Sequence, residues 1–178
     1  METITIKKPS ECSPQELNDF SAFVAKHGQV EKDGLRERIE GALCLVQLIR
    51  DCALIGTAAL KSPSAGSRGT AANGAGVELD EKRLPYELGY VAVAAPEEGK
   101  DFSHCLVAAA LTRAEKKGVY ATTDVKRIAM QTALKARSFV EVGNAYKSTQ
   151  HPSESLCLFI REARKARKRA TTGTRPYA

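Results

Sequence analysis

One segment of this sequence, residues 86–103, combines residue types that could hold an anionic ligand. It begins as an apolar strand, passes through Pro96 and Gly99, and continues into a stretch that favours a helix. Backbone N–H groups at a helix N-terminus lack partners within the helix and attract anions, and small residues let a ligand approach the backbone. The segment therefore has features that suit an anionic ligand, and Glu87 adds a carboxylate on the strand that leads into the turn.

The sequence argues against several other kinds of site. A P-loop needs the pattern GxxxxGK[ST], which is absent, and Gly74-Ala75-Gly76 does not complete GxGxxG. The five cysteines form no CxxC pair, which argues against a zinc site and against a disulfide framework. Free cysteines in this number are typical of a reducing cytoplasm.

The elements that must position the segment follow from periodicity and from capping residues. Residues 13–16 (Ser-Pro-Gln-Glu) form a capping box that begins a helix, and Gly28 is a natural stop for it. Apolar runs at 42–49 and 54–60 predict a β-hairpin, whereas the Ser-, Gly- and Ala-rich stretch predicts a long mobile loop over residues 62–85. Strands are expected at residues 3–7, 42–49, 54–60, 88–94, 119–122, 140–147 and 156–160, and helices at residues 14–27, 35–39, 102–117 and about 124–139.

This order, β-α-α-β-β-β-α-β-α-β-β, predicts one α/β domain over residues 1–162 of the 178-residue chain. A strand-helix-strand-helix-strand block needs crossover connections, so the centre of the sheet cannot be a plain meander.

The net charge of +6 is concentrated at the C-terminus. Residues 161–178 hold seven of the 27 basic residues and one of the 21 acidic ones, which leaves 20 of each in the body. Residues 163–178 are therefore expected to be a disordered basic tail, and nucleic acid is expected to bind only weakly, through that tail. The N-terminus lacks a signal peptide pattern, and no stretch approaches the roughly 20 apolar residues of a membrane span. A cytoplasmic protein without membrane contact is expected.

Residues 86–103 resemble a segment of the GNAT superfamily of N-acetyltransferases. Family members have an E-L-G-aromatic strand, then a proline, and then R/Q-x-x-G-x-G/A at the start of a helix; here the strand reads Glu87-Leu88-Gly89-Tyr90. The strand at 54–60 is also similar to the preceding strand of the family, and the order of elements agrees over nearly the whole chain. The resemblance implies the GNAT fold, a mixed α/β sheet with a splayed, mostly parallel centre.

The same resemblance implies acetyl-coenzyme A as the acyl donor and no metal. Backbone groups of Val91 and Val93 would bind the pantetheine arm. The turn that follows would hold the pyrophosphate through Gly99, Lys100, Asp101, Phe102 and Ser103.

Three positions depart from the family pattern. Glu98 stands where Arg or Gln is usual, Asp101 where the second glycine belongs, and Ser103 where the third small residue belongs. The Asp101 carboxylate can cap its own helix and so occupy the N–H groups that the donor needs, and its negative charge opposes a pyrophosphate. Lys100 offsets part of that charge.

Acetyl transfer to an amine needs a base for the ammonium and a proton donor for the departing thiolate. Glu87 stands where several GNAT enzymes carry a glutamate, and the alternative is a structural glutamate that pairs with a neighbour. Many members donate from a tyrosine where Leu134 stands here. Tyr146 or Tyr90 could replace it, and both could instead be half-buried tyrosines of the sheet.

The function that this resemblance implies is direct acetyl transfer from acetyl-coenzyme A to an amine of a small molecule or peptide, in a ternary complex. Asp101 and Leu134 favour an alternative, a catalytically degenerate GNAT-fold protein that binds an acyl-coenzyme A or a protein partner. A third hypothesis, a nucleic-acid or ribosome-associated protein that uses the tail, is opposed by the neutral body. A homodimer is compatible with the sequence.

Overall fold

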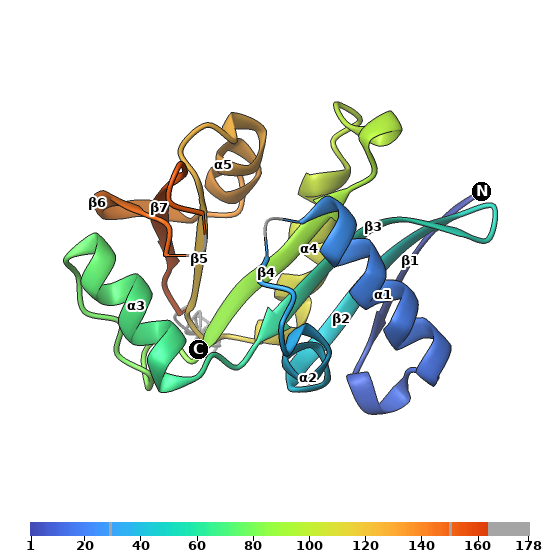
Figure 1. Ribbon diagram of the computed structural model, residues 1–178, viewed down its shortest axis with the longest axis horizontal. Helices are drawn as coiled ribbons and strands as arrows, with labels where there is room; N and C mark the ends of the chain where they lie inside the picture. The colour runs from blue at the N-terminus through green and yellow to red at the C-terminus, as the bar shows by residue number, and fades with distance from the viewer. Residues whose placement is uncertain (29, 150, 164–178) are drawn as a thin grey trace, which may run out of the picture.

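The computed structural model describes residues 1–28, 30–149 and 151–163 (Figure 1). These residues form a seven-stranded mixed sheet in the order β1-β2-β3-β4-β5-β7-β6, with helices on both of its faces. The elements in chain order are β1 (Glu2–Lys7), η1 (Pro9–Glu11), α1 (Pro14–His27), α2 (Leu35–Glu40), β2 (Ala42–Arg50), β3 (Ala53–Lys61), α3 (Ala65–Ala75), β4 (Tyr86–Val93), η2 (Ala95–Glu97), α4 (Phe102–Leu111), η3 (Thr112–Ala114), β5 (Val119–Asp124), α5 (Ile128–Lys135), β6 (Val140–Lys147) and β7 (Ser155–Arg161).

The centre of the sheet is splayed, and it is less parallel than expected. The β4–β5 pair is parallel, whereas the other neighbouring strands of the described sheet are antiparallel. The mixed α/β sheet is thus confirmed, and the expectation of a mostly parallel centre is wrong in extent. The reason is that β7 enters between β5 and β6, so the strands that α5 joins are not neighbours. The crossover through α4 is thus the one that joins neighbouring strands of the described sheet.

The parallel pair holds only at the start of its two strands. Tyr86 pairs with Val119 and Glu87 with Tyr120, and the pairing ends there. Beyond these residues β4 follows β3, and β5 follows β7, so the strands diverge as Figure 1 shows. The sheet therefore consists of two arms, β1 to β4 and β5 to β6, that open from a common base at Glu87.

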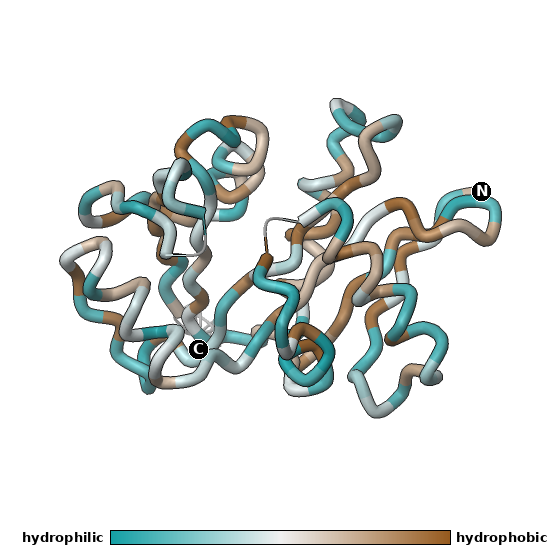
Figure 2. Tube along the Cα trace, in the orientation of Figure 1, coloured by the Kyte–Doolittle hydropathy of each residue, from teal (hydrophilic) through white to brown (hydrophobic). Residues whose placement is uncertain are grey.

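The helices cover both faces of the first arm. Helix α1 begins with the expected capping box, in which the Ser13 hydroxyl accepts from the Glu16 N–H and the Glu16 carboxylate accepts from the Ser13 N–H. Helices α1 and α2 pack Phe20 and Ile39 on one face of the sheet, and α4 packs Leu106 on the other. Figure 2 shows the hydrophobic colour along the central strands, between these helices.

Helix α3 contradicts the expected loop over residues 62–85. Residues 65–75 are helical: the Ser64 hydroxyl accepts from the Ser67 N–H at the start, and Gly76 ends the helix with φ 67°. Packing outweighs the weak helix propensity of Gly and Ser here, because Ala71 and Ala75 are buried against the second arm of the sheet.

The basic tail expected over residues 163–178 lies, apart from Ala163, outside the described residues. In the part of the chain that is described, no helix has the length and apolar character needed to cross a membrane.

Candidate active site

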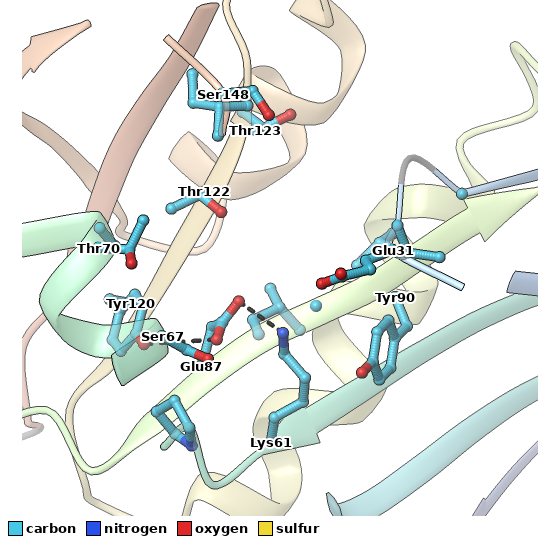
Figure 3. A pocket seen from close by; sticks show the side chains of 18 of the residues that line it. Glu31, Lys61, Ser67, Thr70, Glu87, Tyr90, Tyr120, Thr122, Thr123 and Ser148 are labelled. Atoms are coloured by element: carbon cyan, nitrogen blue, oxygen red, sulfur yellow. Dashed lines mark hydrogen bonds and ion pairs between the residues drawn. The ribbon is translucent and has the colours of Figure 1, made fainter. Parts of the chain in front are cut away.

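A pocket of about 780 Å³ lies in the angle between the two arms of the sheet (Figure 3). Its walls include Glu87 and Val91 of β4, Tyr120 of β5 and Tyr146 of β6. The start of α3 and the segment between α1 and α2 also line it. The splay of β4 from β5 therefore creates a cavity beside the strand that the sequence singled out.

Glu87 stands at the base of this angle, at the last paired position of β4 and β5. Its Oε1 atom lies 2.7 Å from Nζ of Lys61, and its Oε2 atom lies 3.4 Å from the Tyr120 hydroxyl, which donates to it. The side chain is only 14% exposed, and that of Lys61 is 21% exposed. Both hypotheses for Glu87 therefore remain open. Its ion pair with Lys61 fits a structural glutamate, and its place in the pocket lining fits a general base.

The position of Lys61 depends on Gly89. Lys61 is the register partner of Glu87 across β3 and β4, and its side chain passes over Gly89. A Cβ at residue 89 would lie 2.6 Å from Cε of Lys61, so a larger residue would displace the lysine. The ammonium also lies 4.8 Å from the centre of the Tyr90 ring, which attracts a cation. A carboxylate and an aromatic face therefore hold one alkyl ammonium in this pocket.

Tyr120 and Tyr146 of the second arm have raised pKa values in this pocket. Burial, followed by the negative charge of Glu87, raises the pKa of Tyr146 to about 12. The same two causes, in the same order, raise the pKa of Tyr120. The ring of Tyr146 packs against Gly74 of α3, where a Cβ would lie 2.4 Å from Cδ2 of the ring. Leu134, at the position of the usual family tyrosine, is fully buried in the core.

Strand β4 bulges where it passes the pocket. Three steps on β4, from Gly89 to Ala92, face two steps on β3, and Tyr90 has φ 54°. The Thr57 hydroxyl donates to the Tyr90 carbonyl at 2.9 Å, which fixes the bulge. Val91 lines the pocket, and both Val91 and Val93 pack partly against the core. Among the described residues, β4 has no strand partner on its β5 side beyond Glu87, so its backbone is open to a ligand there.

Two residues of the turn before α4 have the left-handed backbone conformation that favours glycine. Gly99 has φ 81° and Asp101 has φ 58°. The Asp101 side chain makes no capping hydrogen bond to α4, so the expectation that it caps its own helix is wrong. The carboxylate therefore does not occupy the first-turn N–H groups, and only its charge opposes an anion. Phe102 packs partly against the core, whereas Ser103 is half-buried at the start of the helix.

Two cations lie beside this turn and share one carboxylate. Glu97 accepts from Nζ of Lys100 at 2.9 Å and lies 2.6 Å from Nη1 of Arg50. The Lys100 hydrogen bond, and then that of Arg50, hold the pKa of Glu97 below its usual value. The Arg50 guanidinium also lies 5.5 Å from the centre of the Phe102 ring. Arg50 also pairs with Glu2, whose Oε1 atom lies 2.6 Å from its Nη2 atom, so two carboxylates already balance its charge.

Sequence reasoning missed Lys61, Tyr120 and Arg50. Each reaches the site from a strand distant in sequence, and strand pairing brings it there. Lys61 stands at the end of an apolar run, which is only a weak indication of a site residue. The sequence does not show that this run pairs with residues 86–93. Arg50 and Tyr120 carried no local signal.

Solved structures with the same fold exist, but their sequences are only distantly similar to this chain. No protein-family model matches the chain, and no curated protein has a significantly similar sequence. Among solved structures, an acyl-CoA N-acyltransferase from Pseudomonas aeruginosa is similar with a TM-score of 0.62 and 18% identity, over 90% of this chain and 99% of that one. The ribosomal-protein-S18-alanine N-acetyltransferase from Escherichia coli has a TM-score of 0.64 and 15% identity, over 95% and 98%.

An acetyltransferase of the GNAT family from Streptococcus agalactiae gives a TM-score of 0.64 at 13% identity, over 91% of this chain and 96% of that one. The chain therefore has the fold of the GNAT acetyltransferases. At these identities the likeness establishes the fold and no more.

Proposed function

We propose that this protein transfers an acetyl group from acetyl-coenzyme A directly to an amine, with Glu87 as the general base. The observation that carries the proposal is the Glu87 carboxylate at the base of the splay, already 2.7 Å from an alkyl ammonium. A base must lie within hydrogen-bonding distance of the proton that it removes, and Glu87 meets this condition for an ammonium in the pocket.

The donor site is proposed on the features that fit a coenzyme A. The unpaired side of β4 near Val91 offers backbone groups to pantetheine amides, as an edge strand does to an added chain. The turn at residues 99–103 precedes the N-terminus of α4, where N–H groups and the helix dipole favour a pyrophosphate. Arg50 and Lys100 lie beside this turn and would hold the pyrophosphate by exchanging their pairing with Glu97 for it. When bound, acetyl-coenzyme A supplies the acetyl group as a reactive thioester.

The proton for the departing thiolate is proposed to come from Tyr146. The phenol carries its proton at neutral pH, and its pKa of about 12 means that it donates only to a strongly basic group such as the departing thiolate. It lines the same pocket as Glu87 and Val91. Tyr120 is a second phenol in that pocket, but its hydroxyl already donates to Glu87.

The test is a titration followed by turnover. Acetyl-coenzyme A should raise the melting temperature by mass action, and a panel of primary amines should then reveal coenzyme A release. Glu87→Gln should lower turnover about 10²-fold while the cofactor-dependent melting shift is retained. An unchanged rate in Glu87→Gln, or no melting shift at millimolar acetyl-coenzyme A, would contradict the proposal.

A second candidate function is acyl-coenzyme A binding without catalysis. The negative charge of Asp101 at the turn and the buried Leu134 at the usual tyrosine position favour it. A melting shift with acetyl-coenzyme A and no turnover with any amine would support this candidate over the first.

A further inference from the structure

Lys61 is a primary amine that the fold itself presents to the proposed base. It lies on β3 directly opposite Glu87 of β4, so the two side chains emerge on the same face of the sheet. An exposed cross-strand ion pair would need no further explanation. This pair differs, because both side chains are largely buried, at 21% and 14% exposure, and both line the 780 Å³ pocket.

The surroundings of the Lys61 nitrogen are those that an acceptor amine would need. Oε1 of Glu87 lies 2.7 Å away, and the Tyr90 ring centre lies 4.8 Å away (Figure 3). Val91, the proposed pantetheine contact, follows Tyr90 directly in the strand and lines the same pocket. The amine, the base and the proposed donor strand therefore meet in one cavity.

We infer that Lys61 is an internal acetyl acceptor, so that the protein acetylates its own Lys61 when acetyl-coenzyme A is present without an external amine. The inference rests on the proposed function of the same pocket. It also points to a primary alkylamine, of the kind that a lysine side chain presents, as the class of external acceptor that competes with Lys61 for Glu87.

The reaction balances without any further reactant. The Lys61 ammonium gives one proton to the Glu87 carboxylate, which passes it to water. The Lys61 nitrogen forms an amide bond to the acetyl carbon while the thioester C–S bond breaks. The second proton leaves the nitrogen and the coenzyme A thiolate is protonated, so the products are an acetyl-lysine, a free thiol and one proton.

The modification would change the site that performs it. An acetylated Lys61 carries no positive charge and cannot form the ion pair with Glu87, so the base becomes free for an external ammonium. Because an amide is not an acetyl donor under these conditions, Lys61 is modified once per molecule.

The experiment is incubation of the full chain with acetyl-coenzyme A alone, followed by intact-mass measurement and peptide mapping. We expect one acetyl group at Lys61, gained at a rate per molecule that does not depend on protein concentration. Lys61→Arg should abolish the gain of this acetyl group. The matched variant Lys82→Arg, at an exposed lysine, should still gain it. Glu87→Gln should slow acetylation of Lys61 about 10²-fold and leave that of the exposed Lys117 unchanged.

Two outcomes separate this inference from the proposed function. If acetyl-coenzyme A raises the melting temperature and Lys61 is acetylated no faster than Lys117, the inference is wrong and the proposed function stands. If acetyl-coenzyme A causes no melting shift, both are wrong. Acetylation of Lys61 that slows in proportion to dilution would show transfer between molecules and would also overturn the internal acceptor.

Discussion

At the scale of single residues, the Glu87 carboxylate acts on one ammonium and on two phenols that line the pocket with it. Glu87 contacts both Lys61 and Tyr120, and its negative charge contributes to the raised pKa of Tyr146. A change at any one of these residues should therefore alter the others, and effects of single substitutions here should not add.

The raised pKa of Tyr146 predicts that the free energy of unfolding falls at high pH. Its pKa is raised from 10.0 to about 12 in the folded chain, so the folded state holds the phenolic proton where the unfolded state releases it. Its contribution to stability is complete below about pH 10 and should be lost progressively as the pH rises toward about 12. Tyr146→Phe should remove part of this alkaline decline, measured by urea unfolding across that range.

Tyr86 provides the control for Tyr146, because it is a half-buried sheet tyrosine outside the residues that line the pocket. Tyr86→Phe should leave the alkaline decline as it is in the unaltered chain. An equal flattening in both variants would mean that the decline does not arise from the pocket.

At the scale of elements, the turn before α4 separates backbone effects from charge effects. Asp101 has φ 58°, a conformation that glycine adopts freely, so Asp101→Gly should stabilise the fold by up to about 1 kcal/mol. It also removes a negative charge beside the proposed pyrophosphate site, so the melting shift with acetyl-coenzyme A should grow.

Asp101→Asn is the matched variant, because asparagine tolerates the left-handed conformation and has no charge. The two variants should bind acetyl-coenzyme A more tightly to a similar degree, as measured by calorimetry. Tighter binding in Asp101→Gly alone would assign the effect to the backbone and remove the electrostatic argument.

Helix α3 positions Tyr146 through a glycine. A Cβ at residue 74 would lie 2.4 Å from the Tyr146 ring, whereas a Cβ at residue 69 of the same helix meets nothing within 4 Å. Gly74→Ala should therefore destabilise the protein by about 1–3 kcal/mol or displace the ring and lower activity. Gly69→Ala should stabilise it slightly, because alanine favours a helix. Urea unfolding of both variants measures the contrast, and equal effects would contradict the role of Gly74.

The elements differ in how far the sequence could predict them. The strand and helix around residues 86–111 could be predicted because the capping, turn and apolar signals lie within one contiguous segment. Helix α3 could not, since three of its eleven residues are glycines and its helical form depends on packing against the second arm. The bulge at Tyr90 gave no signal, because a positive φ at a tyrosine is imposed by the strand pairing and by the bond from Thr57.

At the scale of the whole molecule, the described core of the sheet and its helices lies before the basic C-terminal stretch. The last buried hydrophobic residue among the described residues is Ile160, and Glu162 forms an ion pair with Arg83. Among the described residues, the buried hydrophobic side chains of both arms thus lie at or before residue 160. This separation makes the contribution of the last residues measurable by removal.

Deletion of residues 164–178 should leave a cooperative melt and the melting shift with acetyl-coenzyme A, because the described core and the proposed donor site lie outside that stretch. The deletion removes six basic residues and no acidic ones, so the formal net charge falls from +6 to zero. Binding to nucleic acid or heparin depends on such charges and weakens with salt, so salt-dependent retention on heparin should disappear. A variant with these six residues replaced by glutamine keeps the length and should behave in the same way. Loss of the cooperative melt in the deletion, with the glutamine variant intact, would show instead that residues 164–178 stabilise the fold through contacts other than charge.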